Sequence, residues 1–131
     1  MKALDTNILA RYLRDDDPEQ SSRAARLIQR ALNESQPLYL NHVVLCELTW
    51  ILRSVYDHSK AEIIKTIESI LSTGQFELED KECVEAALAD YRNAKADFAD
   101  CLIGRRNWSM KCDSTYTFDR SLRNVETFEV V

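Results

Sequence analysis

Short apolar segments alternate along this chain with longer segments of helical periodicity. The segments at 3–5, Leu38–Leu40 and Phe76–Leu78 are each followed by a longer helical one, which predicts right-handed strand–helix–strand crossovers. Such crossovers place helices on both faces of a parallel sheet. The sequence therefore predicts an α/β fold, a three-layer α/β/α sandwich with a short, mostly parallel central sheet.

The positions of the helices follow from apolar spacing and from capping residues. Ala24, Leu27, Ile28 and Ala31 recur at intervals of three and four, which is typical of one face of an amphipathic helix over 19–33. The acidic run at 15–17 before Pro18 predicts a loop and a helix start. Similar signals predict helical or turn structure over 8–13, helices over 41–55, 59–72, 80–94 and 97–110, and strands over 114–117 and 126–131.

Length and composition restrict the class of protein. A chain of 131 residues that is 45% hydrophobic and 30% charged predicts one domain, 1–131, with one core. Its two glycines, Gly74 and Gly104, exclude a phosphate-binding glycine loop. No apolar run approaches the roughly 18 residues that span a bilayer, and Asp5 interrupts any signal-peptide core. We therefore expect a soluble, cytoplasmic protein without membrane association.

The cysteines indicate neither a disulfide framework nor a zinc centre. Cys46, Cys83, Cys101 and Cys112 form no C-x-x-C pair and are expected to be reduced core thiols. His42 and Cys46 have helical i, i+4 spacing, but no second ligand pair would complete a zinc site.

Charge is distributed unevenly along the chain. The net charge is −5, and residues 57–90 carry nine acids against three bases, which leaves the remainder at +1. This balance argues against non-specific sliding on bulk nucleic acid, and it leaves room for a local basic rim beside an acidic site.

Five carboxylates stand at positions where sites form. Asp5 follows the first predicted strand and Asp119 follows the fourth, and functional residues of parallel sheets gather beyond such strand ends. Glu47 is the only charge in 43–52 and has apolar neighbours at helical spacing, so it needs a partner. Asp97 and Asp100 share the first turn of a predicted helix.

Each of these acids also has a structural explanation. Asp5 could form a turn, Glu47 could be a partly exposed helical glutamate, Asp97 could cap a helix, Asp100 could complement the helix dipole, and Asp119 could be a loop residue. Their common placement at one edge favours a shared role. Clustered carboxylates without basic partners favour a divalent cation held by hard oxygen ligands.

Four motifs in order resemble the PIN domain, and among PIN proteins the VapC-type ribonuclease toxins of bacterial toxin–antitoxin pairs. The motifs are Leu-Asp-Thr-Asn-Ile-Leu at 4–9, Glu47 within a helix, Asp-Phe-Ala-Asp-Cys-Leu-Ile at 97–103 and Thr-Tyr-Thr-Phe-Asp at 115–119. The resemblance implies an endoribonuclease that depends on Mg²⁺ or Mn²⁺. It implies that Asp5, Glu47 and Asp100 are core acids, that Asp119 is the fourth, that Asp97 is an additional acid, and that Asn7 and Thr117 support the site.

The resemblance also implies partners and a mechanism. An RNA substrate, a small antitoxin protein and a homodimer are expected. Cleavage by activated water would leave a 5′-phosphate and a 3′-hydroxyl, since His42 and His58 offer no acid–base pair near this edge. Basic residues near the acids could contact the RNA backbone, and these are Arg11, Lys95, Arg105, Arg106, Arg120 and Arg123.

Two functions from other classes remain as alternatives. The chain could be a non-catalytic α/β module whose acidic cleft docks a basic peptide. It could also be a phosphatase or phosphoacceptor acting through Asp5, although Arg120 stands after Asp119 where that chemistry usually wants a lysine.

Overall fold

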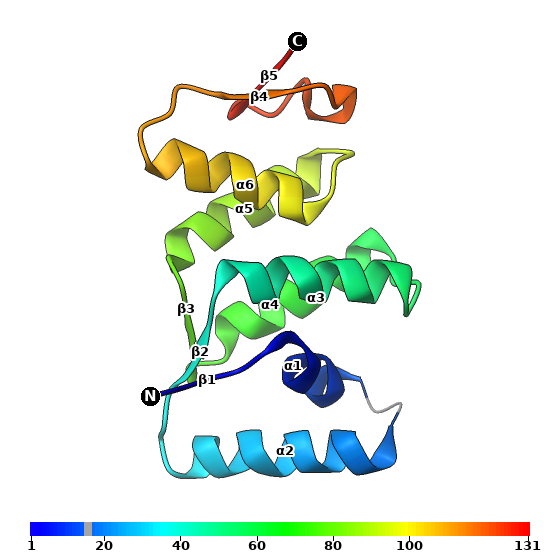
Figure 1. Cartoon of the computed structure of the whole chain (residues 1–131), viewed down its shortest axis with the longest axis vertical. Helices are drawn as coiled ribbons and strands as arrows, with labels where there is room; N and C mark the ends of the chain where they lie inside the picture. The colour runs from blue at the N-terminus through cyan, green and yellow to red at the C-terminus, as the bar shows by residue number, and fades with distance from the viewer. Residues whose placement is uncertain (15–16) are drawn as a thin grey trace.

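The computed structural model describes residues 1–14 and 17–131, and Figure 1 shows the arrangement of its helices and strands. Asp15 and Asp16, part of the acidic run expected to form a loop, lie outside the described residues. The elements in chain order are β1 (Lys2–Ala3), α1 (Thr6–Leu13), α2 (Pro18–Asn33), β2 (Leu38–Leu40), α3 (His42–Ser54), α4 (Lys60–Ser72), β3 (Phe76–Leu78), α5 (Lys81–Asn93), α6 (Phe98–Ser109), β4 (Thr115–Thr117), the 3₁₀ turn η1 (Arg120–Leu122) and β5 (Phe128–Val130).

A short parallel sheet joins the N-terminal half of the chain. Its strand order is β1-β2-β3, which is also the order along the chain. Leu38, Leu40, Phe76 and Leu78 are buried, whereas Tyr39 and Glu77 on the alternate face are less so. The expected mixed α/β class with a short parallel sheet is confirmed.

Side chains that precede the helices set where the helices begin. Asp5, Asp17, Asn41, Ser59 and Asp80 each occupy an N-cap position and accept a hydrogen bond from a backbone N–H of the first turn. Ser59 also forms a capping box with Glu62. These caps explain why the predicted helix starts lie within a residue or two of the observed ones.

The C-terminal strands differ from the expected single sheet. β4 and β5 pair with each other in parallel and form a separate two-stranded sheet, which lies beyond α6 in Figure 1. Both strands have a partly exposed pattern, unlike β2 and β3, and α5 and α6 lie between the two sheets in Figure 1. Asp119 is therefore placed by this second sheet.

The buried hydrophobic side chains form one cluster that extends from Leu4 to Val125. All four cysteines are free, as expected. The expectation that all four lie in the core is wrong for Cys112, which is exposed, because it follows the end of α6 where the chain turns toward β4. Within the described residues, no helix is both long and apolar enough to cross a membrane.

Candidate active site

Asp5 lies at the junction between β1 and α1. Its Oδ1 accepts a hydrogen bond from the backbone N–H of Ile8 at 3.0 Å, and its side chain is exposed. The predicted strand 3–5 is displaced, since β1 ends at Ala3 and Asp5 is the N-cap of α1. One carboxylate oxygen is thus held by the backbone, and the other faces solvent.

Glu47 has a partner from the neighbouring helix. The buried hydroxyl of Thr6 donates a hydrogen bond to its Oε1 at 3.0 Å, which ties α3 to the start of α1. The apolar neighbours of Glu47 do not bury it, because Val43 and Trp50 are themselves 65% and 66% exposed. The expected partner is therefore a hydroxyl, and the carboxylate remains open to solvent.

Asp100 and Asp119 are close enough to influence each other. Partial burial in the first turn of α6 raises the pKa of Asp100, and the negative charge of Asp119 raises that pKa further. Hydrogen bonds from the hydroxyl and the backbone N–H of Ser121, at 2.7 and 2.9 Å, lower the pKa of Asp119. Asp100 makes no hydrogen bond or ion pair with any described residue, so its charge is uncompensated.

Asp100 also faces α3. Its charge raises the pKa of the Cys46 thiol, although burial contributes more to that shift. Cys46 immediately precedes Glu47 in α3. Asp100 therefore interacts electrostatically with Asp119 and with the residue that precedes Glu47.

Asp97 occupies the N-cap position of α6 without acting as a side-chain cap. Its carboxylate forms an ion pair with Arg53 in the last turn of α3. No side-chain capping hydrogen bond therefore supports the alternative that Asp97 is only a helix cap. Sequence reasoning missed Arg53, which reads in the sequence as an ordinary cation at a helix C-terminus.

The two supporting residues have contacts other than those expected. Thr117 Oγ1 accepts a hydrogen bond from the backbone N–H of Asp119 at 3.0 Å and so fixes the chain that carries this acid. Asn7 is exposed in α1 and makes no hydrogen bond with described residues. Thr6, one residue earlier, makes the contact with Glu47 instead. The sequence indicated Thr6 only by its position directly after Asp5.

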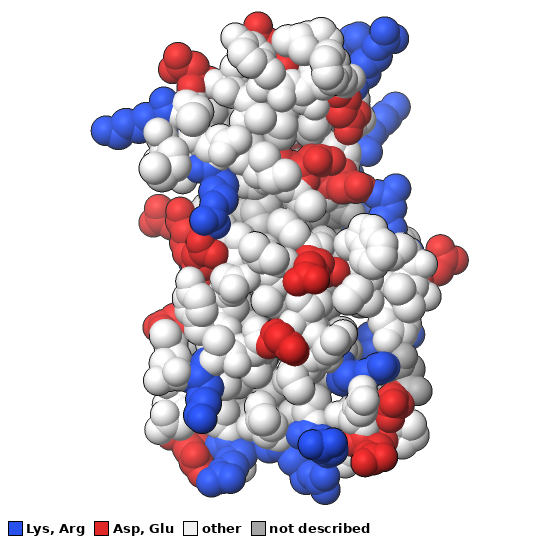
Figure 2. All heavy atoms as spheres, viewed as in Figure 1, with Lys and Arg blue, Asp and Glu red and all other residues white. Residues whose placement is uncertain are grey.

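Acidic side chains gather in separate groups along one face, over α6, α3 and the β1–α1 junction (Figure 2). Among the described residues, no three His, Cys, Asp or Glu side chains are grouped closely enough to hold a metal ion. The donor set still fits a divalent cation, because it consists of hard carboxylate oxygens and includes the uncompensated charge of Asp100.

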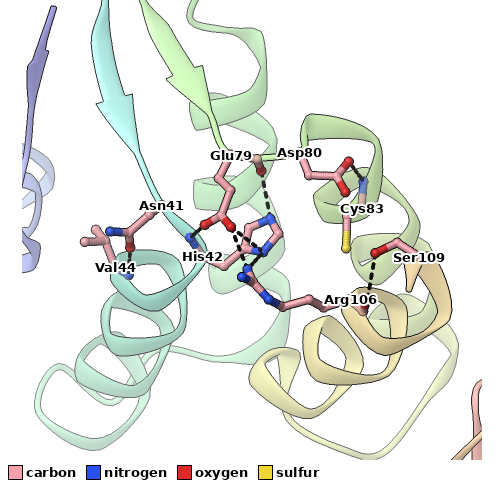
Figure 3. A network of polar contacts seen from close by, with 8 residues as sticks. All are labelled: Asn41, His42, Val44, Glu79, Asp80, Cys83, Arg106 and Ser109. Carbon is pink, nitrogen blue, oxygen red and sulfur yellow. Dashed lines mark hydrogen bonds and ion pairs between the residues drawn. The ribbon is translucent and has the colours of Figure 1, made fainter. Parts of the chain in front are cut away.

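A polar network joins α3, the end of β3 and α6 (Figure 3). The guanidinium of Arg106 can only donate, so His42 Nδ1 accepts its hydrogen bond at 2.6 Å and Nε2–H donates to the carbonyl of Glu79 at 2.7 Å. Glu79 in turn accepts from the His42 backbone N–H and from Arg106. Both ring nitrogens of His42 are thus engaged, which leaves neither for zinc or for acid–base chemistry.

The six basic residues that were expected near the site differ in their interaction partners. Arg105 is bonded to Asp90 and Glu126, and Arg106 to Glu79 and His42. Arg11 donates to Gln20. Lys95, Arg120 and Arg123 line a common cavity and form no ion pair with described residues.

The fold agrees with a comparison against known families. The family model described as the PIN domain matches residues 2–127, nearly the whole chain. The chain therefore belongs to the PIN-domain family. It is similar to a VapC ribonuclease of Aquifex aeolicus (strain VF5), with 24% identity over 125 residues that cover 95% of this chain and 92% of that protein.

Proposed function

We propose that this chain is an endoribonuclease that depends on Mg²⁺ or Mn²⁺, cleaves single-stranded RNA, and is the toxin of a type II toxin–antitoxin pair. The observation that carries the proposal is the uncompensated, partly buried charge of Asp100 beside Asp119 on a PIN-domain chain. The similarity to a VapC ribonuclease supports the activity and the toxin assignment.

Asp5, Glu47, Asp100 and Asp119 would hold the cation, with Asp97 as an additional candidate. Bound there, Mg²⁺ or Mn²⁺ would supply charge stabilisation at phosphorus and lower the pKa of water. The chain restrains its own acids, because backbone N–H groups fix Asp5 and Asp119 and Thr6 fixes Glu47. One carboxylate oxygen of Glu47 remains to accept a proton from the attacking water.

The histidines support a water-dependent route. A ribonuclease that uses the 2′-hydroxyl needs an acid–base pair, but both ring nitrogens of His42 are hydrogen-bonded and His58 Nε2 contacts Arg14 at 3.0 Å. The expected products therefore carry a 5′-phosphate and a 3′-hydroxyl.

The direct test is cleavage of a 5′-labelled single-stranded RNA by the purified protein with Mn²⁺, Mg²⁺ or EDTA. We expect cleavage with either metal and none in EDTA. Asp100→Asn should abolish cleavage, because it removes the charge without changing the shape. Asp113→Asn is the matched control, since Asp113 is exposed and belongs to none of the motifs.

The outcomes separate the proposal from its alternatives. Cleavage in EDTA, or a cyclic phosphate product, would contradict the metal-dependent route. Hydrolysis of phosphomonoesters without RNA cleavage would favour the phosphatase, and binding of basic peptides without hydrolysis would favour the docking module. A loss with Asp97→Asn equal to that with Asp100→Asn would make Asp97 a ligand.

The partners proposed are a second copy of the chain and a small antitoxin. Exposed apolar side chains around Glu47, namely Val43 and Trp50, favour a partner with an amphipathic segment that covers the acidic face. An arginine of such a segment would bond the carboxylates in bidentate fashion and compete with the cation.

If a small gene lies immediately upstream, co-expression with it, followed by size-exclusion chromatography with light scattering, tests both partners. We expect a dimer alone and a larger complex with the antitoxin, in which cleavage is inhibited. Trp50→Ser should weaken the complex. A monomeric protein that recovers no small partner would refute the toxin assignment and leave the nuclease proposal intact.

A further inference from the structure

A cavity of about 430 Å³ is lined by residues that neighbour two of the candidate acids along the chain. Its wall is formed by the end of α5, the connection from α5 to α6, η1 and the loop that follows η1. Lys95 in this wall stands two residues before Asp97, and Arg120 directly follows Asp119. The cavity therefore adjoins the candidate active site along the chain at two points.

Three cationic side chains line this cavity, namely Lys95, Arg120 and Arg123. We call it the cationic cavity. All three are exposed, and none forms an ion pair with any residue the structure describes. Asn124 lies in the same wall and offers an amide donor. Figure 2 shows basic side chains along the edge of the molecule next to the acidic group over α6.

The carboxylates in the same wall do not cancel these charges. Arg105 bonds both oxygens of Asp90, at 2.7 and 2.8 Å, and an oxygen of Glu126 at 2.7 Å. Arg105 thus neutralises one of these two carboxylates, and Lys95, Arg120 and Arg123 outweigh the other, so the cavity keeps a positive net charge. The three cations of the cavity are left to attract an external anion.

We propose that the cationic cavity binds backbone phosphates of the RNA strand next to the phosphate that is cleaved, an inference that rests on the proposed ribonuclease function. The acidic face repels an RNA backbone, and the net charge of −5 gives no general attraction. A local cationic cavity supplies the missing affinity and orients the strand. Guanidinium groups also match the geometry of phosphate oxygens.

The test removes the charges of the cavity while leaving the acids in place. The triple variant Lys95→Gln, Arg120→Gln and Arg123→Gln is compared with wild type by fluorescence anisotropy of a labelled single-stranded RNA in EDTA. We expect affinity to fall about ten-fold or more, and the slope of log affinity against log salt to fall by about 2, from roughly 0.7 for each lost phosphate contact on single strands.

A matched control carries the same loss of charge elsewhere. Arg23→Gln, Arg26→Gln and Lys65→Gln also remove two arginines and one lysine, all exposed on α2 and α4 and none in the cavity. We expect this variant to keep most of the affinity and the salt slope of wild type. An equal loss in both triple variants would overturn the proposal, because it would show a general effect of net charge.

Turnover of two substrates of different size adds a second readout. With Mn²⁺, the cavity variant should raise KM for RNA but leave hydrolysis of bis(p-nitrophenyl) phosphate unchanged, since that small diester does not extend into the cavity. A loss with the small diester would show damage to the active site and contradict a separate phosphate subsite. If wild type cleaves RNA and the cavity variant binds and cleaves as well as it does, the subsite fails and the proposed function stands. If wild type hydrolyses neither substrate, the proposed function fails.

Discussion

The pair formed by Arg105 and Asp90 should be a main source of stability for the part of the fold that carries Asp100. Arg105 in α6 bonds both oxygens of Asp90 in α5 and also reaches Glu126, and the Arg105 and Asp90 side chains are only 17% and 13% exposed. Arg105→Met keeps an unbranched side chain in this place and leaves the Asp90 carboxylate without its cation.

The expected cost follows from burial. Removing one partner of a buried ion pair costs roughly 3–5 kcal/mol, and the remaining solvent access here lowers that to about 2–4 kcal/mol. At this chain length each kcal/mol shifts the melting temperature by about 4 °C, so we expect a decrease of roughly 8–16 °C. Glu126 is 64% exposed and adds little.

Urea unfolding followed by circular dichroism at pH 7 measures this effect. The matched control is Arg92→Met, which breaks the pair with Glu68, where the two side chains are 45% and 50% exposed. That loss should stay below about 1 kcal/mol. Adding Asp90→Leu to Arg105→Met should recover stability, because no buried charge is then left unpaired. The reasoning is refuted if Arg105→Met costs no more than Arg92→Met, or if the double variant is no more stable than the single one.

Three further substitutions test the packing and charge of the same region. Gly104→Ala should destabilise the fold by about 1–2 kcal/mol in urea unfolding, because a methyl group there would overlap the side chains of Phe128 and Thr127, and a gain would show that the two side chains can move aside. Glu79→Gln should reduce the loss of unfolding free energy on acidification below pH 4.5. The His42 backbone N–H lowers the Glu79 pKa, so the Glu79 carboxylate stabilises the fold above the ordinary pKa of 4.5. That stabilisation is lost as the pH falls through the lowered pKa. Asp100→Asn should raise the melting temperature in EDTA at pH 7, because burial and Asp119 raise the Asp100 pKa and disfavour its charged form. This gain should vanish below pH 4. A decrease at pH 7 would contradict an uncompensated charge at Asp100.

Local signals in the sequence were sufficient for the helices and the first sheet. Capping residues such as Asn41 and Ser59 act within one turn, so they could be recognised without knowing the fold. The separation of β4 and β5 from the first sheet was not visible, because it depends on how α5 and α6 pack in space between the two sheets (Figure 1). Pairing between distant strands is decided by packing, which short motifs do not encode.

In the candidate site, too, local signals were visible in the sequence and contacts between elements were not. The motifs supplied the candidate acids, and periodicity placed Glu47 on α3 and Asp100 on α6. Of the two possibilities that the sequence left open for Glu47, the structure shows the exposed one, because its apolar neighbours Val43 and Trp50 are themselves exposed. The contact from Thr6 and the ion pair from Arg53 cross between helices, so only the tertiary structure could reveal them.

Asp5 and Asp119 are both candidate site residues and N-caps, and these two roles constrain how the chain can evolve. Each begins a helical turn through its carboxylate, so selection for folding alone would keep Asp, Asn, Ser or Thr at these two positions even in a lineage without the proposed ribonuclease activity. Asp100 has no such second constraint, and its charge opposes folding. In a gene copy released from selection for cleavage, neutral drift would therefore erase Asp100 first and preserve Asp5 and Asp119 longest, so that an inactive descendant would still carry much of the family's motif.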